Sequence, residues 1–195
     1  AAFELSEQFD TPVLLRLTTR VCHSASAVEL GESANQRISE SADGESVIDQ
    51  FAIRNSQFAI RPFPRNPAKY VMVPGNAVKR HPVIEARIRA VAEYAETCPF
   101  NRVEPGDKAL GIITCGVAYQ YAKEVFPTAS VLKLGMTWPL PEKLIRDFAA
   151  SVERLIVIEE LDPFVEEAVK LWGIPCEGKS IFPLIGEFDP RVVRE

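Results

Sequence analysis

Apolar and polar residues alternate most regularly between residues 107 and 173, where short apolar runs are separated by segments of helical periodicity. Residues 109–114 form a continuous apolar run, which is typical of a strand covered on both faces in a parallel sheet, and residues 130–134 and 154–158 are two further predicted strands. Three segments with apolar residues every three or four positions are predicted helices: 117–126, 142–151 and one that opens at Pro163. The order predicts a βαβαβα unit.

The fold class that this order predicts is α/β, a three-layer architecture around an open, mostly parallel sheet. Crossovers between parallel strands are right-handed in nearly all proteins, and helices then cover both faces. Three stripes are predicted to face the sheet: Val117, Tyr121 and Val125; Leu144, Ile145 and Phe148; Phe164, Ala168 and Leu171. Residues 174–176 are predicted to lead into a short fourth strand.

The pattern before residue 107 is less regular. Residues 81–94 have the spacing of an amphipathic helix that packs on the domain, and the Pro-rich segments RPFPRNP and VPGN before it favour extended or turn conformations. Residues 2–8 are typical of the last turns of a helix and residues 13–18 of a strand. Because this helix lacks an N-cap signal and the strand has no local sheet to join, we expect the chain to begin inside a domain.

Composition narrows the class of protein. Hydrophobic residues make up 47% and charged residues 25% of the chain, as in average globular proteins. No apolar run approaches the roughly 20 residues that a bilayer requires, and the acidic start does not resemble a signal peptide, so we expect a cytoplasmic protein. The four cysteines lie far apart without a C-x-x-C pair, which favours buried thiols over a metal or iron-sulfur motif.

Charge is unevenly distributed. The net charge of -5 argues against a nucleic-acid binder. Six acidic residues between Glu29 and Asp49 face one arginine, which is typical of a linker. The following basic stretch has a single acidic residue, Glu85: Arg54, Arg61, Arg65, Lys69, Lys79, Arg80, Arg87 and Arg89. It is either a docking surface for an acidic partner or a solvated connector, and the second interpretation is favoured.

Motifs for chemistry are few. The sequence has no P-loop, no G-x-G-x-x-G and no G-x-S-x-G motif. Gly116 lies between a strand and a helix, where backbone amides can hold an anion, although a plain turn is the commoner role. Glu159, Glu160 and Asp162 follow a strand, where paired carboxylates bind metal or exchange protons. Asp162 as the N-cap of a helix that starts at Pro163 is the favoured alternative.

The remaining candidate side chains give weaker signals. His81 precedes Pro82 at a predicted helix start, which favours a surface or capping role. His23 follows the first predicted strand beside Arg20, within reach of a neighbouring site. Trp138 and Trp172 are expected to fill sheet–helix packing. No catalytic residue and no metal ligand is assigned.

Several segments together resemble a known family. The segments DTPVLLRLTTRVCHS, KYVMVPGNAVKRHPVIEARI and GIITCGVAYQYAKEV, and the runs LGMTWPLP and LIVIEEL, are similar to the alpha subunit of indolepyruvate ferredoxin oxidoreductases, in the thiamine-diphosphate-dependent 2-oxoacid:ferredoxin oxidoreductase family. The resemblance covers nearly the whole chain except about residues 31–57. It implies that residues 107–185 form a domain similar to the transketolase C-terminal domain.

The resemblance implies five segments in a larger subunit: residues 1–30 end a truncated pyrimidine-binding domain, 31–68 are an acidic then basic linker, 69–106 a connector, 107–185 the α/β domain and 186–195 an exit linker. The parent enzyme oxidatively decarboxylates arylpyruvates to aryl-acetyl-CoA and reduces ferredoxin, with thiamine diphosphate, Mg, 4Fe-4S clusters and coenzyme A. Its glutamate, G-D-G and cysteine motifs are absent here, so we expect an inactive, non-catalytic scaffold without a cofactor of its own.

The resemblance also implies partners: other domains of the subunit, a beta subunit and ferredoxin, with a homodimer as a further option. Arg20, His23 and Gly116 are the candidates for a cofactor contact, and none of them has a defined role. Two other functions stay open. One is a flavodoxin-like regulatory module that holds a phosphorylated ligand or FMN at Gly116, and the other is a module that docks an acidic partner through its basic connector.

Overall fold

The structure is a computed structural model of the 195-residue chain and describes residues 1–25, 27 and 65–194. These residues form two compact units, Ala1–Asn76 and Ala77–Glu195, which are treated separately. The predicted acidic linker and the arginines at positions 54 and 61 lie outside the described residues.

The first unit contains short helices. They are α1 (Ala2–Phe9), α2 (Thr19–His23) and α5 (Pro67–Tyr70). The helix predicted over residues 2–8 is confirmed, but the strand predicted over 13–18 is wrong, because these residues form no ladder and the side chains of Leu14, Leu15 and Leu17 are exposed. A strand is stable only when its backbone groups are paired, and the described part of this unit has no partner strand.

The second unit is built on a sheet in the order β1-β3-β2-β4. Its strands are β1 (Arg102–Glu104), β2 (Asp107–Cys115), β3 (Ala129–Leu134) and β4 (Leu155–Ile158). Strands β3, β2 and β4 run parallel, which confirms the predicted parallel core, and β1 joins β3 antiparallel at the edge. The fourth strand predicted after residue 176 is reduced to one bridge between Ile156 and Glu177.

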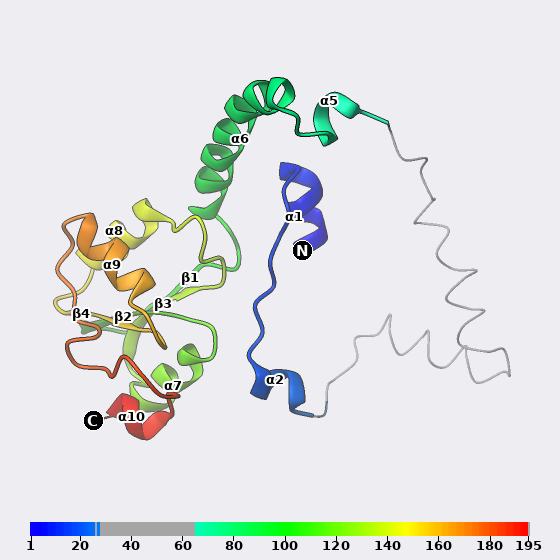
Figure 1. Cartoon of the computed structure of the whole chain (residues 1–195). Coiled ribbons are helices and arrows are strands. Elements are labelled where there is room, and N and C mark those ends of the chain that lie inside the picture. The colour runs from blue at the N-terminus through cyan, green and yellow to red at the C-terminus, as the bar shows by residue number, and fades with distance from the viewer. Residues whose placement is uncertain (26, 28–64, 195) are drawn as a thin grey trace, which may run out of the picture. The chain divides into compact units, whose positions relative to one another are not determined.

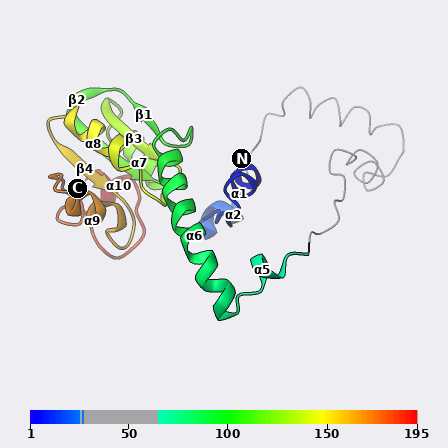
Figure 2. The same ribbon diagram turned by 90° about the horizontal axis from the view of Figure 1, so that it is seen from above.

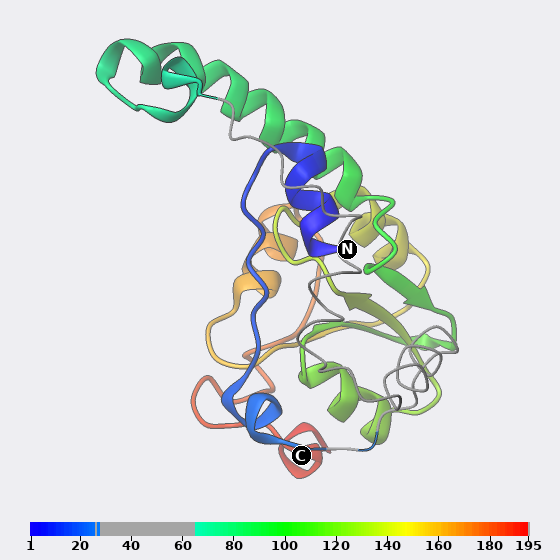
Figure 3. The ribbon, with the colours of Figure 1, turned by 90° about the vertical axis from the view of Figure 1, so that its right-hand side faces the viewer.

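Helices cover both faces of this sheet (Figure 1). Helices α7 (Ala118–Val125) and α10 (Pro190–Arg194) lie on one face, and Figure 3 shows them, in light green and red, on the same side of the strands. Helices α8 (Glu142–Ala150) and α9 (Phe164–Leu171) lie on the other. The three-layer α/β fold predicted from the sequence is confirmed.

Alternation along the strands explains the two cores. Successive side chains of a strand point to opposite faces. In β2, Ile112 packs with α7 and α10, whereas Ile113 packs with α8 and α9. In β3, Val131 and Leu132 divide in the same way. β2 and β3 therefore carry apolar side chains on both faces, as expected of strands that are covered on both sides.

Two of the three predicted helix faces need correction. α8 buries Ile145 and Phe148 as predicted. α7 buries Ala118, Tyr119 and Ala122, and the predicted Tyr121 and Val125 are only partly buried. α9 buries Val165 and Val169, whereas Phe164 is 49% and Leu171 is 85% exposed. Both helices are rotated by about one residue, or 100°, from the predicted orientation.

The connector helix is longer than predicted. α6 spans Pro74–Ala95 instead of 81–94, and Figure 2 shows it as one long green helix. The VPGN segment therefore starts the helix, because proline is tolerated in a first turn, where its missing N–H has no intrahelical acceptor. Of the predicted stripe, Ile84 and Ile88 are exposed and only Ala95 is fully buried, so α6 packs on the domain through its C-terminal end alone.

The residues after α9 also pack on the sheet. Phe182, Phe188 and Val193 belong to the core beneath α7, and Val193 lies in α10. The Asp189 carboxylate accepts hydrogen bonds from the amides of Arg191 and Val192 and thereby caps α10. Across residues 1–25 and 65–194, no helix is long and apolar enough to cross a membrane.

Candidate functional site

The carboxyl ends of β2 and β4 form the place where the chain reverses its direction of winding. From β2 the chain passes through α7 to β3 on one side, and from β3 through α8 to β4 on the other side of β2. Crevices at such a switch point bind ligands in many open α/β sheets. The loops at this point are residues 116–117 after β2 and 159–163 after β4.

The first loop turns at Gly116. Its backbone φ is +58°, and an added Cβ would meet no atom within 4 Å. A side chain is therefore disfavoured by backbone conformation and not by lack of space. Gly116 is exposed, and α7 begins two residues later without a side-chain cap. The predicted strand–turn–helix junction is present, and a ligand role for Gly116 stays a prediction.

The second loop is organised by Glu159. Its side chain is only 5% exposed, and its carboxylate accepts hydrogen bonds from the amides of Val165 at 2.9 Å and Glu166 at 2.9 Å. Glu159 thus caps the start of α9. The prediction that Asp162 is the N-cap is wrong, because α9 starts at Phe164 and Pro163 in the N-cap position has no side-chain hydrogen bond.

Leu161 explains how a residue so far upstream reaches the helix start. Its φ of +61° is left-handed, a conformation that is unusual for a branched side chain. The loop therefore turns back on itself between β4 and α9. Non-glycine residues held in this region concentrate at turns and at functional sites.

A buried ionic cluster adjoins this cap. The Glu166 carboxylate accepts hydrogen bonds from Lys170 Nζ at 2.5 Å and from the Lys179 amide at 2.7 Å. Lys179 Nζ donates to the Glu159 carbonyl at 2.5 Å. The cluster thus joins β4, α9 and the segment after Gly178. It fixes the relative positions of three elements that are distant in the sequence.

The pKa values of Glu159 and Glu166 are shifted in opposite directions. Burial raises the pKa of Glu159, although its amide donors and Lys179 favour the charged form. For Glu166, burial acts upward, but the hydrogen bonds from Lys170 and Lys179 outweigh it and lower the pKa. Burial also lowers the pKa of Lys179 and raises that of the Cys176 thiol.

These contacts concern the carboxylates that follow β4 and were considered as a possible metal or acid–base pair. Glu159 caps a helix, and Glu160 accepts a hydrogen bond from the Phe188 amide at 2.9 Å. Within the described part of the chain, no group of three or more His, Cys, Asp or Glu side chains is arranged to hold a metal ion. Glu159 and Glu160 therefore have backbone partners that account for their positions.

Two structural polar residues, the buried Asn101 and the half-buried Glu96, were not found from the sequence. The Asn101 side chain accepts hydrogen bonds from the amides of Gly135 and Met136 and donates to the Ala95 carbonyl. Glu96 accepts from the amides of Lys143 and Leu144 and caps α8. Both fasten the end of α6 to the loop after β3. Neither residue belongs to a local sequence motif, because the amides that each one binds lie 34 or more residues further along the chain.

An exposed apolar surface lies at the same edge of the sheet. Trp138, after β3, is 69% exposed, which corrects the expectation that it fills the core, whereas Trp172 packs against the core of α8 and α9 as expected. The Trp138 and Phe164 rings lie 6.2 Å apart. Together with Leu161, which is also exposed and lies in the loop before α9, they form what we call the apolar edge: Trp138, Leu161 and Phe164.

The remaining candidates lie outside this site. Arg20 and His23 belong to α2 in the first unit, where His23 is exposed and the Arg20 side chain is outside the described residues. His81 is an exposed residue of α6, and its Nε2 lies 3.5 Å from Glu85 Oε1. Of the cysteines, Cys98 is buried and Cys115 and Cys176 are partly buried, but Cys22 is exposed.

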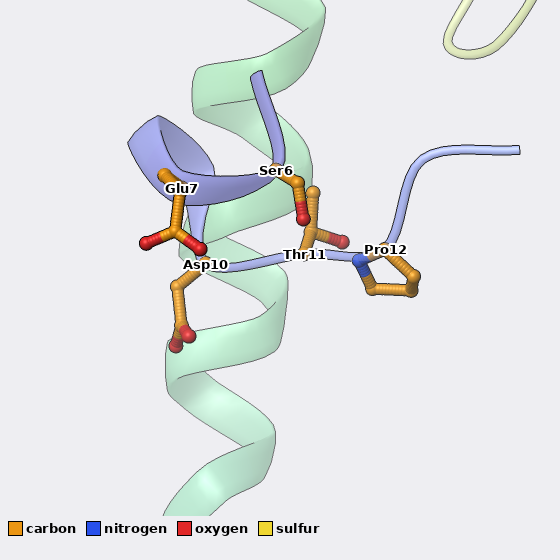
Figure 4. A pocket seen from close by; sticks show the side chains of 5 residues that line it. All are labelled: Ser6, Glu7, Asp10, Thr11 and Pro12. Atoms are coloured by element: carbon orange, nitrogen blue, oxygen red, sulfur yellow. The ribbon is translucent and has the colours of Figure 1, made fainter. Parts of the chain in front are cut away.

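The first unit also has a shallow hollow of about 270 Å³ beside α1. Figure 4 shows the residues that line it: Ser6, Glu7, Asp10, Thr11 and Pro12. The Asp10 carboxylate already pairs with Lys69 Nζ at 2.7 Å. The hollow is open and acidic, and no convergent set of polar donors defines a ligand within it.

Comparison with known proteins identifies relatives. The chain is 35% identical over 202 aligned residues to the indolepyruvate oxidoreductase subunit IorA of Thermococcus kodakarensis, and 37% identical over 209 to that of Methanothermobacter marburgensis. These alignments cover 97% and 99% of this chain but only 29% and 30% of the relatives, so the chain spans less than a third of their length. No family model matches the chain.

The fold has a counterpart among solved structures. A 2-oxoglutarate:ferredoxin oxidoreductase from Magnetococcus marinus, solved with 2-oxoglutarate, coenzyme A and succinyl-CoA bound, superposes with a TM-score of 0.50 at 18% identity. The match covers 63% of this chain and 23% of that chain. At this identity the likeness shows the fold alone, and it agrees with a domain similar to the transketolase C-terminal domain.

The chain is thus similar in sequence to one segment of the indolepyruvate oxidoreductase subunits IorA, and its fold is also found in a 2-oxoacid:ferredoxin oxidoreductase. The resemblance noted in the sequence is thereby confirmed.

Proposed function

We propose that the chain is a non-catalytic scaffold portion of an indolepyruvate:ferredoxin oxidoreductase alpha subunit. The proposed parent oxidatively decarboxylates arylpyruvates to aryl-acetyl-CoA and reduces ferredoxin. One observation carries the proposal: 97% of this chain aligns at 35% identity with 29% of an IorA subunit. A domain that spans so small a part of its relatives is best understood as one component of a larger catalytic unit.

The cofactors of the proposed parent are assigned to its other domains. Thiamine diphosphate with Mg requires carboxylate and carbonyl ligands directed into an accessible site. Glu159, Glu160 and Glu166 instead accept hydrogen bonds from backbone amides within this domain. These described carboxylates do not fit the role of metal ligand, and we derive no catalytic step from them. The iron-sulfur clusters and the coenzyme A site are placed by the same proposal elsewhere in the subunit.

The proposed role of this domain is to hold the cofactor-binding domains of the subunit in fixed relative positions. Its parallel sheet, with a separate core on each face, makes a rigid body. Its apolar edge supports packing against other domains of the subunit, because exposed patches that contain Trp and Phe mark interaction surfaces. A displacement of about 1 Å between two cofactor-binding domains costs on the order of a hundredfold in rate, so such a scaffold matters without touching the substrate.

The same proposal gives partners and a location. The beta subunit and ferredoxin would be partners of the parent, and a homodimer of the alpha subunit is compatible with it. We place the parent in the cytoplasm.

The test compares the isolated chain with the complete enzyme. The 195-residue chain should show no arylpyruvate-dependent reduction of ferredoxin. In the complete enzyme, Trp138→Ser with Phe164→Ser should lower kcat while cofactor content stays unchanged. Lys143→Gln, on the exposed surface of α8, is the matched control and should leave kcat intact. Turnover by the isolated chain would disprove the scaffold role.

A further inference from the structure

The Thr114 hydroxyl is a buried polar group without a partner. Thr114 lies near the end of β2 and is 1% exposed. Among the residues that the structure describes, no atom forms a hydrogen bond with its Oγ1. Buried hydroxyls are nearly always hydrogen-bonded in folded proteins, so this donor has room for an acceptor that the described residues do not supply.

The Thr114 side chain lies on the face of β2 that α7 covers. Thr114 is two residues after Ile112 and therefore lies on the same face of β2, the face that packs against Ala118 and Tyr119. Since α7 starts three residues after Cys115 and passes back over this face, its first turn lies above the last side chain that β2 directs there. The first amides of a helix have no intrahelical acceptor and attract anions.

A lysine lies beside Thr114 in the sheet. In the sheet Thr114 pairs with Lys133 of β3, and Lys133 Nζ lies 4.4 Å from the centroid of the Tyr119 ring. Arg102, which pairs with Lys133, and Lys123 both contact Glu104, whose carboxylate also accepts the Tyr119 hydroxyl. Three cations thus accompany one carboxylate, and that carboxylate is already shared among three donors.

We propose that the first turn of α7, the Thr114 hydroxyl and the Lys133 ammonium bind a phosphate group, either as inorganic phosphate or on a phosphorylated small molecule. Gly116 leaves the approach to the α7 amides open, because it is exposed and lacks a side chain. The Lys133 side chain is partly exposed and moves from the Tyr119 ring onto the phosphate. The phosphate supplies the acceptor that Thr114 lacks.

Nuclear magnetic resonance on the 195-residue chain tests the site directly, by titration with inorganic phosphate and separately with adenosine diphosphate. The backbone amide signals of residues 116–119 should shift in a saturable way. Tighter binding of the nucleotide at these residues would identify a phosphorylated ligand, and equal binding would identify free phosphate. Unchanged signals of residues 116–119 with both probes would overturn the proposal.

Substitutions assign the contacts. Thr114→Val keeps the side-chain shape and Lys133→Gln removes the charge, and each should weaken binding about tenfold while the thermal midpoint is retained. Lys143→Gln on α8, over the opposite face, is the matched control and should bind like the wild-type chain. Wild-type affinity in both test variants would overturn the proposal. This outcome would leave the scaffold role untouched, because that role requires no ligand here.

Discussion

Replacement of Glu159 by alanine tests the capping interaction that joins β4 to α9. The carboxylate is 5% exposed and accepts hydrogen bonds from the amides of Val165 and Glu166, each at 2.9 Å. Alanine leaves both amides without this acceptor in a site that water does not reach easily. The loss is therefore larger than for a cap on the protein surface.

The magnitude follows from these contacts. Each buried donor left unsatisfied costs about 1–3 kcal/mol, whereas removal of a carboxylate whose pKa is raised by burial returns part of that cost. We expect Glu159→Ala to lower the free energy of unfolding by about 2–4 kcal/mol. Glutamine keeps an oxygen at the Oε1 position, which contacts both amides at 3.1 and 2.9 Å. Glu159→Gln should therefore cost less than about 1 kcal/mol.

Urea unfolding followed by far-ultraviolet circular dichroism measures these differences. With a slope of roughly 2 kcal/mol/M, Glu159→Ala lowers the midpoint by about 1–2 M. Asp162→Ala is the decisive control, because the local sequence places the cap there, and we expect a change within about 0.5 kcal/mol. An equal loss from Asp162→Ala and Glu159→Ala would refute the structural assignment. An equal loss from Glu159→Gln and Glu159→Ala would show that charge, not hydrogen bonding, stabilises the loop.

Three further predictions concern other contacts. An added Cβ at Gly178 would collide with the Glu166 carboxylate, so Gly178→Ala should lower the free energy of unfolding by about 1–3 kcal/mol in urea. Asn101→Ala removes the one oxygen that accepts hydrogen bonds from two backbone amides and should cost about 1–3 kcal/mol in the same assay. A neighbouring guanidinium lowers the pKa of Asp189 from 3.8 to about 2. Its stabilising contribution is therefore complete above pH 3.8 and is lost as the pH falls through 2, which carbon-13 resonance of the carboxyl group can follow.

The parallel core could be predicted because its signal is local. The runs that became β2, β3 and β4 are rich in apolar residues, and Pro127 and Gly173 lie just after α7 and α9. A strand covered on both faces needs this pattern whatever its neighbours are. β1 has only three residues, two of them charged, and depends on pairing with β3. Nothing in its own sequence distinguishes it from a loop.

The orientation of α9 shows why the helix faces were harder to predict. Phe164, Ala168 and Leu171 form one apolar stripe, and Val165 and Val169 form a second stripe displaced by one residue. Both satisfy helical periodicity. The choice between them depends on the loop before the helix, where Leu161 is left-handed and Glu159 holds the first amides. That geometry involves β4 and is not encoded in the helix itself.

Only the part of the candidate site that has a local sequence signal could be predicted. Gly116 was recognisable because a glycine between a strand and a helix is a local signal, and its positive φ agrees with that position. Thr114 gave no signal, because its importance depends on which face of β2 it occupies and on its register with Lys133. Glu159 was noted for a different role, since a cap supplied from six residues before the first capped amide matches no local motif.

The two stripes of α9 also connect the fold to the proposed function. A helix of eight residues that buries Val165 and Val169 must direct Phe164 and Leu171 away from its own core, because the stripes are about 100° apart. A helix that served a free-standing domain would carry polar residues there. Trp138, from a different loop, contacts Phe164 and extends the same surface. Apolar residues from two loops and one helix are thus exposed together at one edge, an arrangement expected of a domain that packs inside a larger subunit.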